Sequence, residues 1–259
     1  MKLNRYLSKI ELGEPINLDR FLQCLPFSNR DEWRKIYSAI RVRDGYRLTI
    51  KSIEAHKDLY VQEASDRVSA SKLGRSHGFQ SNFAHVLVLN SMAKLQVPFV
   101  VVSDLNGYKT QGNLIGKCAV VIENVENFYR YQEFLERIGH AELAFSSDII
   151  FGAGNQICHQ LNHAFLSNYS EIYCAQDVEL GGLTTYKSLK ASLPQCQWLA
   201  PADWQAFREN FKLKPKNNDH LTKAIKLARE LDLNAEADLM NQTRHFMEQE
   251  AFLPVWHKD

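Results

Sequence analysis

The spacing of hydrophobic residues changes about a third of the way along the chain. Before that point, apolar residues recur at helical intervals, most clearly over residues 18–25, and a short strand-like alternation follows at residues 46–50. Beyond it, short apolar runs alternate with amphipathic stretches of about a dozen residues, as in strands that alternate with helices. The change predicts two domains, residues 1–95 and 96–259.

The first domain is predicted to be mostly helical. It is rich in charged residues, and its last segment, residues 83–95, has the apolar content of another helix. The alternation at residues 46–50 predicts a short ribbon. Helices followed by a ribbon are typical of a winged-helix-like or arm domain. The alternative is a helical cap that packs on the second domain.

The second domain is predicted to have an α/β fold. Its strands are expected at residues 97–102, 117–123, 148–151 and 171–175. Its helices are expected at residues 126–138, 155–166, 183–193, 219–231 and 235–250. Strands that alternate with helices favour right-handed βαβ units. We therefore expect a mainly parallel sheet flanked by helices.

Carboxylates directly follow two of these strands. Glu123 comes after the apolar run 118–122, and Asp177 and Glu179 come after the run 171–175. Open α/β sheets bind ligands at the carboxyl ends of their strands, and side chains two residues apart in extended backbone point the same way. Converging like charges repel unless a cation or hydrogen bonds compensate. The pattern predicts a divalent metal site, with a helix N-terminal acid and a solvated turn as the simpler alternatives.

Several segments resemble one known family, in the same order along the chain. They are VIENVENF at residues 121–128, FGAG at 151–154, QDVELGGL at 176–183, LAPADW at 199–204 and MEQE at 247–250. Together they resemble the Toprim-domain nuclease subunit of Wadjet-type anti-plasmid systems, which is related to the A subunit of type IIB topoisomerases. The resemblance covers about residues 115–255 and does not clearly reach the first hundred residues.

The resemblance implies a Toprim sheet preceded by a winged-helix-type domain, with carboxylates that hold Mg²⁺ or Mn²⁺ beside a scissile DNA phosphate. Carried over by position, Glu123 would be a metal ligand or an acid–base group, and Asp177 and Glu179 would be metal ligands. The chain departs from the family at two positions: Glu179 stands where Asp is usual, and Gln176 stands where Gly is usual. A longer carboxylate changes the geometry offered to Mg²⁺, which demands a near-octahedral site.

The acidic residues near the C-terminus are harder to assign. Residues 235–250 are predicted to be helical, and on a helix Glu248 and Glu250 would face in different directions. Glu248 is therefore a candidate outer ligand of the metal. Glu250 is expected to cap the helix or to pair with a base such as Arg244.

The leading hypothesis is a metal-dependent DNA endonuclease subunit of an SMC-associated plasmid-defence system. Its expected partners are DNA, an SMC-type ATPase complex and a second copy of the chain, because cutting both strands takes two sites. A topoisomerase would need a tyrosine nucleophile, and Tyr37, Tyr46 and Tyr60 lie in no recognisable motif. The alternatives are a catalytically inactive Toprim-like subunit that binds DNA or partners and, ranked last, a small-molecule phosphotransferase.

Overall charge gives no general attraction to nucleic acid, because the formal net charge is only +1. DNA contacts would have to come from local basic groups. The candidates are the cluster of Lys212, Lys214, Lys216, Lys223 and Lys226 and, in the first half, Arg67, Lys72 and Arg75. The 5 cysteines form no C-x-x-C pair, which indicates reduced core thiols. No apolar run approaches membrane-spanning length and no signal-peptide core is found, so a cytoplasmic protein is expected.

Overall fold

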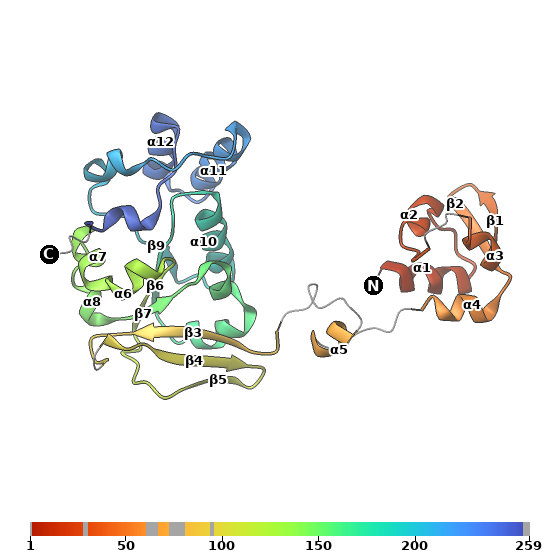
Figure 1. Ribbon diagram of the computed structural model, residues 1–259, viewed down its shortest axis with the longest axis horizontal. Helices are drawn as coiled ribbons and strands as arrows, with labels where there is room; N and C mark the ends of the chain where they lie inside the picture. The colour runs from red at the N-terminus through yellow and green to blue at the C-terminus, as the bar shows by residue number, and fades with distance from the viewer. Residues whose placement is uncertain (1, 28–30, 61–66, 73–80, 94–95, 256–259) are drawn as a thin grey trace. The chain divides into compact units, whose positions relative to one another are not determined.

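The computed structural model describes residues 2–27, 31–60, 67–72, 81–93 and 96–255. The chain divides into two compact units, Met1–Ser81 and Asn82–Asp259 (Figure 1). This division precedes the boundary expected at residue 95, because Ala84–Leu89 forms a strand of the large sheet where the sequence predicted a helix. Val86 and Val88 are buried and His85 is exposed. That alternation belongs to a strand.

The N-terminal unit consists of helices followed by a hairpin. Its elements are α1 (Lys2–Glu11), α2 (Leu18–Leu22), α3 (Trp33–Ile36), β1 (Tyr37–Val42), β2 (Gly45–Ile50), α4 (Ile53–Asp58) and α5 (Arg67–Lys72). Asn17 caps α2 by accepting a hydrogen bond from the backbone N–H of Arg20 at 3.0 Å. Ile16 pairs with Tyr46 of the hairpin. The order of helices and then a ribbon is the predicted one, and the winged-helix assignment stays a prediction.

The C-terminal unit is built on a mixed sheet of 7 strands. The strands are β3 (Ala84–Leu89), β4 (Phe99–Asp104), β5 (Gly107–Thr110), β6 (Cys118–Ile122), β7 (Ser147–Phe151), β8 (Glu171–Ala175) and β9 (Cys196–Trp198), and they lie in the order β5-β4-β3-β7-β6-β8-β9. Neighbouring strands run parallel in the group β7-β6-β8-β9. They pair antiparallel in the group β5-β4-β3, and β3 is also antiparallel to β7.

The expected mainly parallel sheet is therefore parallel in only one half. The turn between Asp104 and Gly107 is too short for a crossover, so β4 and β5 can only be antiparallel neighbours. Asp104 stabilises this turn by accepting a hydrogen bond from the backbone N–H of Asn106 at 2.7 Å. The antiparallel half comes from β3 and β5, two strands that the hydrophobic pattern did not predict.

Helices cover both faces of the sheet. They are α6 (Val125–Tyr129), α7 (Tyr131–Arg137), α8 (Leu143–Ser146), α9 (His163–Leu166), α10 (Leu180–Ser192), α11 (Asn218–Glu230) and α12 (Asn234–Thr243), with 3₁₀ turns η3 (Gly154–Cys158), η4 (Gln160–Asn162), η5 (Trp204–Asn210) and η6 (Gln249–Phe252). Strand β6 is buried along its whole length and separates two cores, with Val120 and Ile122 in one and Ala119 and Val121 in the other. Figure 1 shows β3, β4 and β5 along one edge of the sheet, with α11 and α12 toward the other.

Three expected helices have different bounds. The helix expected at residues 126–138 is divided at Arg130, and the one expected at 155–166 is replaced by η3, η4 and the short α9. The last expected helix ends at Thr243, because Arg244 adopts the left-handed conformation with φ 62°. Residues 245–250 therefore leave the helix, which changes the environment of both C-terminal glutamates.

In the parallel half of the sheet, the connections change direction between β6 and β8. Strand β6 lies between β7 and β8, so the chain leaves β6 toward one side of the sheet and leaves β8 toward the other. Loops that diverge in this way open a crevice at the carboxyl ends of the two strands, where α/β proteins bind ligands. Glu123 and Asp177 follow these two strand ends. Across the described residues, no helix has the length and apolar character that a membrane crossing requires.

Candidate active site

Glu123 directly follows β6 and faces the loop after β8. Its backbone N–H donates to the carbonyl of Ala175 at 3.2 Å, which continues the pairing of the two strands by one residue. One side-chain oxygen, Oε2, accepts a hydrogen bond from the backbone N–H of Asp177 at 3.1 Å. The two acidic loops predicted from the sequence are thus joined directly.

Asp177 is held by a third segment, near the C-terminus. Its Oδ1 accepts a hydrogen bond from the backbone N–H of Gln249 at 2.7 Å. The next residue, Val178, forms an antiparallel bridge with Met247, so the C-terminal segment (residues 246–254) lies alongside the loop after β8. The site is therefore built from three segments that are far apart in the sequence.

Gln249 connects all three segments. It is 1% exposed, and its side-chain Oε1 accepts a hydrogen bond from the backbone N–H of Asn124 at 3.1 Å. Its own carbonyl accepts from the Asn127 side chain at 3.0 Å. A buried amide with these contacts fixes the separation of Glu123 and Asp177. Sequence reasoning missed Gln249, although it lies between the two C-terminal glutamates that were considered.

Glu250 reaches the site, and Glu248 is not placed there by any described contact. The Asn124 side chain donates to Oε1 of Glu250, and the same Asn124 caps α6 by accepting from the backbone N–H of Glu126 at 2.9 Å. Glu248 precedes η6 in extended backbone and is exposed. The expectations for this pair were wrong in two respects: α12 does not extend to them, since Glu248 precedes and Glu250 lies in the 3₁₀ turn η6, and Glu250 pairs with Asn124, not with Arg244.

Glu179 lies at the N-terminus of α10. Its carbonyl accepts from the Leu183 backbone at 3.0 Å, and its side chain caps no helix N–H. Two glycines follow closely. A Cβ on Gly181 would lie 2.7 Å from Oε1 of Glu179, and one on Gly182 would clash with the carbonyl oxygen of Asp177. The Gly-Gly pair therefore allows the start of α10 to approach the acidic loop.

The glycine-rich turn after β7 packs against the end of β6, next to Glu123. Gly154 begins the short 3₁₀ turn η3. Gly152 donates to the carbonyl of Ile122 at 2.7 Å, and a Cβ there would lie 3.2 Å from Cγ1 of Val121 and 3.3 Å from the carbonyl oxygen of Ile122. The absence of a side chain at Gly152 therefore permits close packing against the end of β6, next to Glu123.

The carboxylates raise one another's affinity for protons. Burial raises the pKa of Glu123, and the charges of Glu179 and Glu250 act in the same direction. Burial also raises the pKa of Asp177, to about 7, with further contributions from the charges of Glu123, Glu250 and Glu179. The hydrogen bond from Gln249 opposes this rise without cancelling it. Perturbed carboxylates clustered in a crevice are typical of functional sites.

The donor atoms suit a hard divalent cation. They are carboxylate oxygens, and the backbone N–H groups engage one oxygen each of Glu123 and Asp177, which leaves the second oxygen of each for a cation. In the part of the chain that is described, however, no three His, Cys, Asp or Glu side chains gather closely enough to form a ready metal-binding group. The site has the ligand chemistry for a metal, and its carboxylates are not drawn together as a cage.

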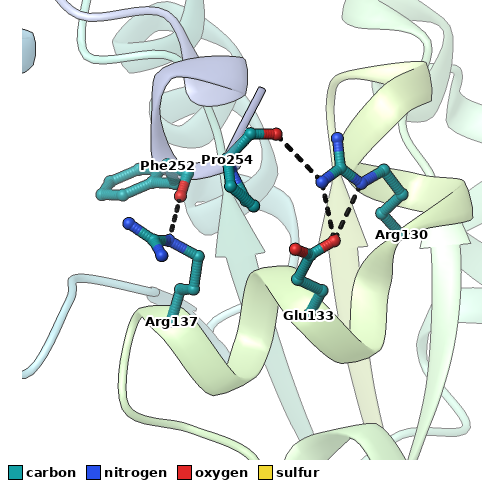
Figure 2. Close-up of polar contacts among 5 residues, drawn as sticks. All are labelled: Arg130, Glu133, Arg137, Phe252 and Pro254. Carbon is teal, nitrogen blue, oxygen red and sulfur yellow. Dashed lines mark hydrogen bonds and ion pairs between the residues drawn. The ribbon is translucent and has the colours of Figure 1, made fainter. Parts of the chain in front are cut away.

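Two arginines of the α6–α7 region anchor the C-terminal segment beyond the site (Figure 2). Arg137 donates to the carbonyl of Phe252 at 2.7 Å, and Arg130 donates to the carbonyl of Pro254 at 3.1 Å. Arg130 is held in turn by Glu133, with an Nη2–Oε2 separation of 2.7 Å. Because the same segment carries Gln249, these contacts hold it against the helices that follow Glu123.

The predicted DNA-binding residues lie in both units of the chain. Lys212 and Lys214 are exposed on either side of Leu213, which pairs with Phe246 of the C-terminal segment, and Lys216 is exposed nearby in sequence. Lys72 is exposed at the end of α5 in the N-terminal unit, which also carries Arg67. Arg75 lies outside the described residues.

Tyr37, one of the tyrosines weighed as a nucleophile, is unsuited to that role. Its side chain is 1% exposed and its hydroxyl is hydrogen-bonded to Nδ1 of His56 at 2.7 Å. Burial raises its pKa further above the usual range. A buried hydroxyl that is reluctant to ionise cannot attack a phosphate in DNA.

Comparison with protein families and curated proteins does not indicate a function for this chain. The chain matches no protein-family model and no curated protein. The reading of its function therefore rests on the geometry described above and on the ordered segments that resemble a Toprim nuclease.

Proposed function

We propose that this chain is a metal-dependent DNA endonuclease subunit of an SMC-associated plasmid-defence system. The observation that carries the proposal is the convergence of Glu123, Glu179 and Glu250 on Asp177 beyond the carboxyl ends of β6 and β8, where burial, together with these charges, raises the pKa of Asp177 to about 7. Such repulsion is costly in a structural role and useful where a cation and a phosphate are to be bound.

Each residue has a proposed role. Asp177 and Glu179 would hold Mg²⁺ or Mn²⁺, with Glu123 as a further ligand or as the acid–base group. A bound divalent cation would supply neutralisation of the phosphate charge and stabilisation of the leaving oxygen. Glu123, whose raised pKa makes it a better proton acceptor than an ordinary carboxylate, takes a proton from the attacking water. Gln249 keeps Asp177 in place by its backbone hydrogen bond.

DNA would approach along the lysines beside the C-terminal segment. Lys212, Lys214 and Lys216 make no ion pair with any described residue, whereas Lys223 and Lys226 pair with Asp219 and Glu230. Unpaired lysines can neutralise backbone phosphates without first giving up a partner. The SMC-type ATPase complex and a second copy of this chain belong to the same proposal and rest on the family resemblance.

Plasmid nicking tests the catalytic part of the proposal. With Mn²⁺ or Mg²⁺, the unaltered chain should relax or linearise supercoiled plasmid, and Glu123→Gln and Asp177→Asn should each lower the rate at least about a hundredfold. Glu126→Gln is the matched control, because Glu126 is exposed in the first turn of α6 and loses the same charge. Equal rates in all the variants would show that this site does not cut DNA.

Metal binding has its own readout. Mn²⁺ should raise the melting temperature of the unaltered chain, because a ligand that binds only the folded state stabilises it. Asp177→Asn should remove most of this increase, and Glu126→Gln should leave it unchanged. If Mn²⁺ shifts all three proteins alike, the cation binds elsewhere.

The alternative is a catalytically inactive Toprim-like subunit that binds DNA or partner proteins. It is favoured by the lack of a ready metal-binding group among the described residues and by the longer Glu179. It predicts salt-sensitive DNA retention without nicking. Charge reversal of Lys212, Lys214 and Lys216 should weaken this retention, and reversal of the ion-paired Lys187, Lys223 and Lys226 should weaken it less.

A further inference from the structure

A basic cleft lies in the N-terminal unit, which the proposed function does not use. It has a volume of about 550 Å³ and is bordered by α1, α2 and the segment that joins them. Arg5 and Lys9 stand one turn apart on α1, and Arg20 faces them from α2. A cleft of this volume is in the range that holds small ligands.

The cations in this cleft are only partly neutralised. Lys9 pairs with Glu14 at 3.2 Å. Arg5 and Arg20, by contrast, make no ion pair within the described part of the chain, and both are exposed. A guanidinium presents two parallel N–H donors, which match two oxygens of a phosphate. Two such groups around one cleft favour a phosphate over a carboxylate, since a phosphate offers more acceptor oxygens.

The remainder of the lining is suited to a planar ring. Tyr6 contributes an aromatic side chain that is held edge-on against Phe21, with ring centroids 5.8 Å apart. Asn17 and Gln23 contribute amides. Since Asn17 uses its oxygen to cap α2, its NH₂ group remains a donor. Aromatic surface with nearby amides is how proteins recognise the face and edge of a nucleobase.

The wall of the cleft is fixed by the hairpin. Ile16, between the cleft residues Pro15 and Asn17, exchanges two backbone hydrogen bonds with Tyr46, each 2.9 Å long. Gly45 has φ +137°, and a Cβ there would lie 2.5 Å from the Ile16 carbonyl oxygen. Only a residue without a side chain permits this approach. A cleft that is already formed loses little entropy when it binds a ligand.

We propose that this cleft binds a nucleoside 5′-phosphate. Arg5 and Arg20 would receive the phosphate, Tyr6 would contact the base, and the amides of Asn17 and Gln23 would meet its edge. The same chemistry occurs in a free mononucleotide and in the 5′-phosphorylated end of a DNA strand. Binding at this cleft is independent of the carboxylate site and requires no cleavage.

Calorimetric titration of the full chain with 5′-dAMP and 5′-dGMP, in the presence of EDTA, tests the proposal. Arg20→Glu and Arg5→Glu should each weaken binding about tenfold or more, because each removes a charge-assisted contact. Arg43→Glu is the matched control: Arg43 is exposed in the same unit, on the hairpin turn and outside the cleft. The matching nucleosides and inorganic phosphate should each bind more weakly than the nucleotide.

Competition by oligonucleotides identifies the source of the ligand. Displacement of the nucleotide by a 5′-phosphorylated strand, and not by its 5′-hydroxyl counterpart, would support the proposal and assign the cleft to DNA ends. Failure of both strands, with tight mononucleotide binding, would support it and assign the cleft to free nucleotides. The absence of nucleotide binding, or an equal loss in Arg43→Glu and Arg20→Glu with all variants folded by circular dichroism, would overturn it.

Discussion

Two aspartates of the C-terminal unit show how differently a buried carboxylate can be used. Asp148 in β7 is fully buried and accepts hydrogen bonds from the side chains of Asn90 at 2.7 Å and Tyr169 at 3.1 Å, and from the backbone of Ile115 at 3.1 Å and Gly116 at 2.9 Å. Asp177 accepts one hydrogen bond, from Gln249, and lies near three other carboxylates.

The difference separates a structural carboxylate from a functional one. The donors around Asp148 come from the residue after β3, from the segment before β6 and from the segment before β8, so its carboxyl group holds the sheet to its connections. Asp177 accepts too few hydrogen bonds to offset its burial and the negative charges beside it, and its pKa rises to about 7. A buried carboxylate with several hydrogen-bond donors is typical of a structural role. A buried carboxylate near other negative charges at a strand end is typical of a binding site.

The largest expected effect is loss of the Asp148 carboxylate. Asp148→Ala should lower the free energy of unfolding by at least about 4 kcal/mol, because it leaves several buried donors without an acceptor. Asp177→Ala should lower it far less at pH 5 and should raise it at pH 8, where the variant lacks a repelled charge. Urea unfolding of both variants measures the contrast. Equal losses would show that the two carboxylates have the same structural role.

The second effect is a dependence of stability on pH that belongs to Asp177. Its pKa is about 7 in the folded chain, against an ordinary value of 3.8. Between these values the folded protein retains a proton that the unfolded chain has released, so the free energy of unfolding falls as pH rises. The part due to Asp177 should be about 2 kcal/mol between pH 5 and pH 8.

Asp177→Asn isolates this part, because it keeps the oxygen that Gln249 contacts and removes the titration. Urea unfolding of both proteins at pH 5 and pH 8 should show a decline in the unaltered chain that is about 2 kcal/mol steeper than in the variant. Parallel pH profiles would mean that Asp177 does not titrate in this range.

The sequence correctly predicted that the loops after β6 and β8 are neighbours. It did not predict that Gln249 joins them. Glu123 and Asp177 follow apolar runs, and strand ends in a parallel sheet meet at one edge, so their proximity could be inferred from local pattern alone. Gln249 is 72 residues from Asp177 in the sequence, and nothing local to it signals a hydrogen bond to that carboxylate. Contacts of such long range depend on how the C-terminal segment packs against the loop after β8.

The errors in the fold have similar causes. The apolar run at residues 83–95 predicts a helix, although residues 84–89 form a strand, because a dense apolar run looks alike in a buried strand and in a buried helix. The helix expected to continue to residue 250 ends early because Arg244, with no glycine to signal it, adopts φ 62°. Local spacing therefore identified the β6–β8 core well and failed where tertiary packing decided the backbone conformation.

The third prediction concerns Gln249, the residue that the sequence did not reveal. Gln249→Ala should lower the free energy of unfolding by about 1.5 kcal/mol, because the partly buried Asn124 N–H loses its acceptor. Gln242→Ala, an exposed glutamine on α12, should change it by less than about 0.5 kcal/mol. If urea unfolding gives both variants the stability of the unaltered chain, Gln249 does not hold the acidic loops together.

The smallest effect should come from Asn124, which both caps a helix and borders the acidic site. Asn124→Ala removes the cap of α6 and should cost about 1 kcal/mol at any pH. Asn124→Asp keeps a capping oxygen and places another carboxylate beside the site, so its cost should grow between pH 5 and pH 8, as Asp177, whose pKa is about 7, loses its proton. Urea unfolding of the two variants at both pH values separates capping from repulsion. A pH-independent cost in Asn124→Asp would imply that charge near Glu250 is well screened by solvent, and the carboxylate cluster would then resemble an ordinary exposed surface more than the surroundings of Asp177.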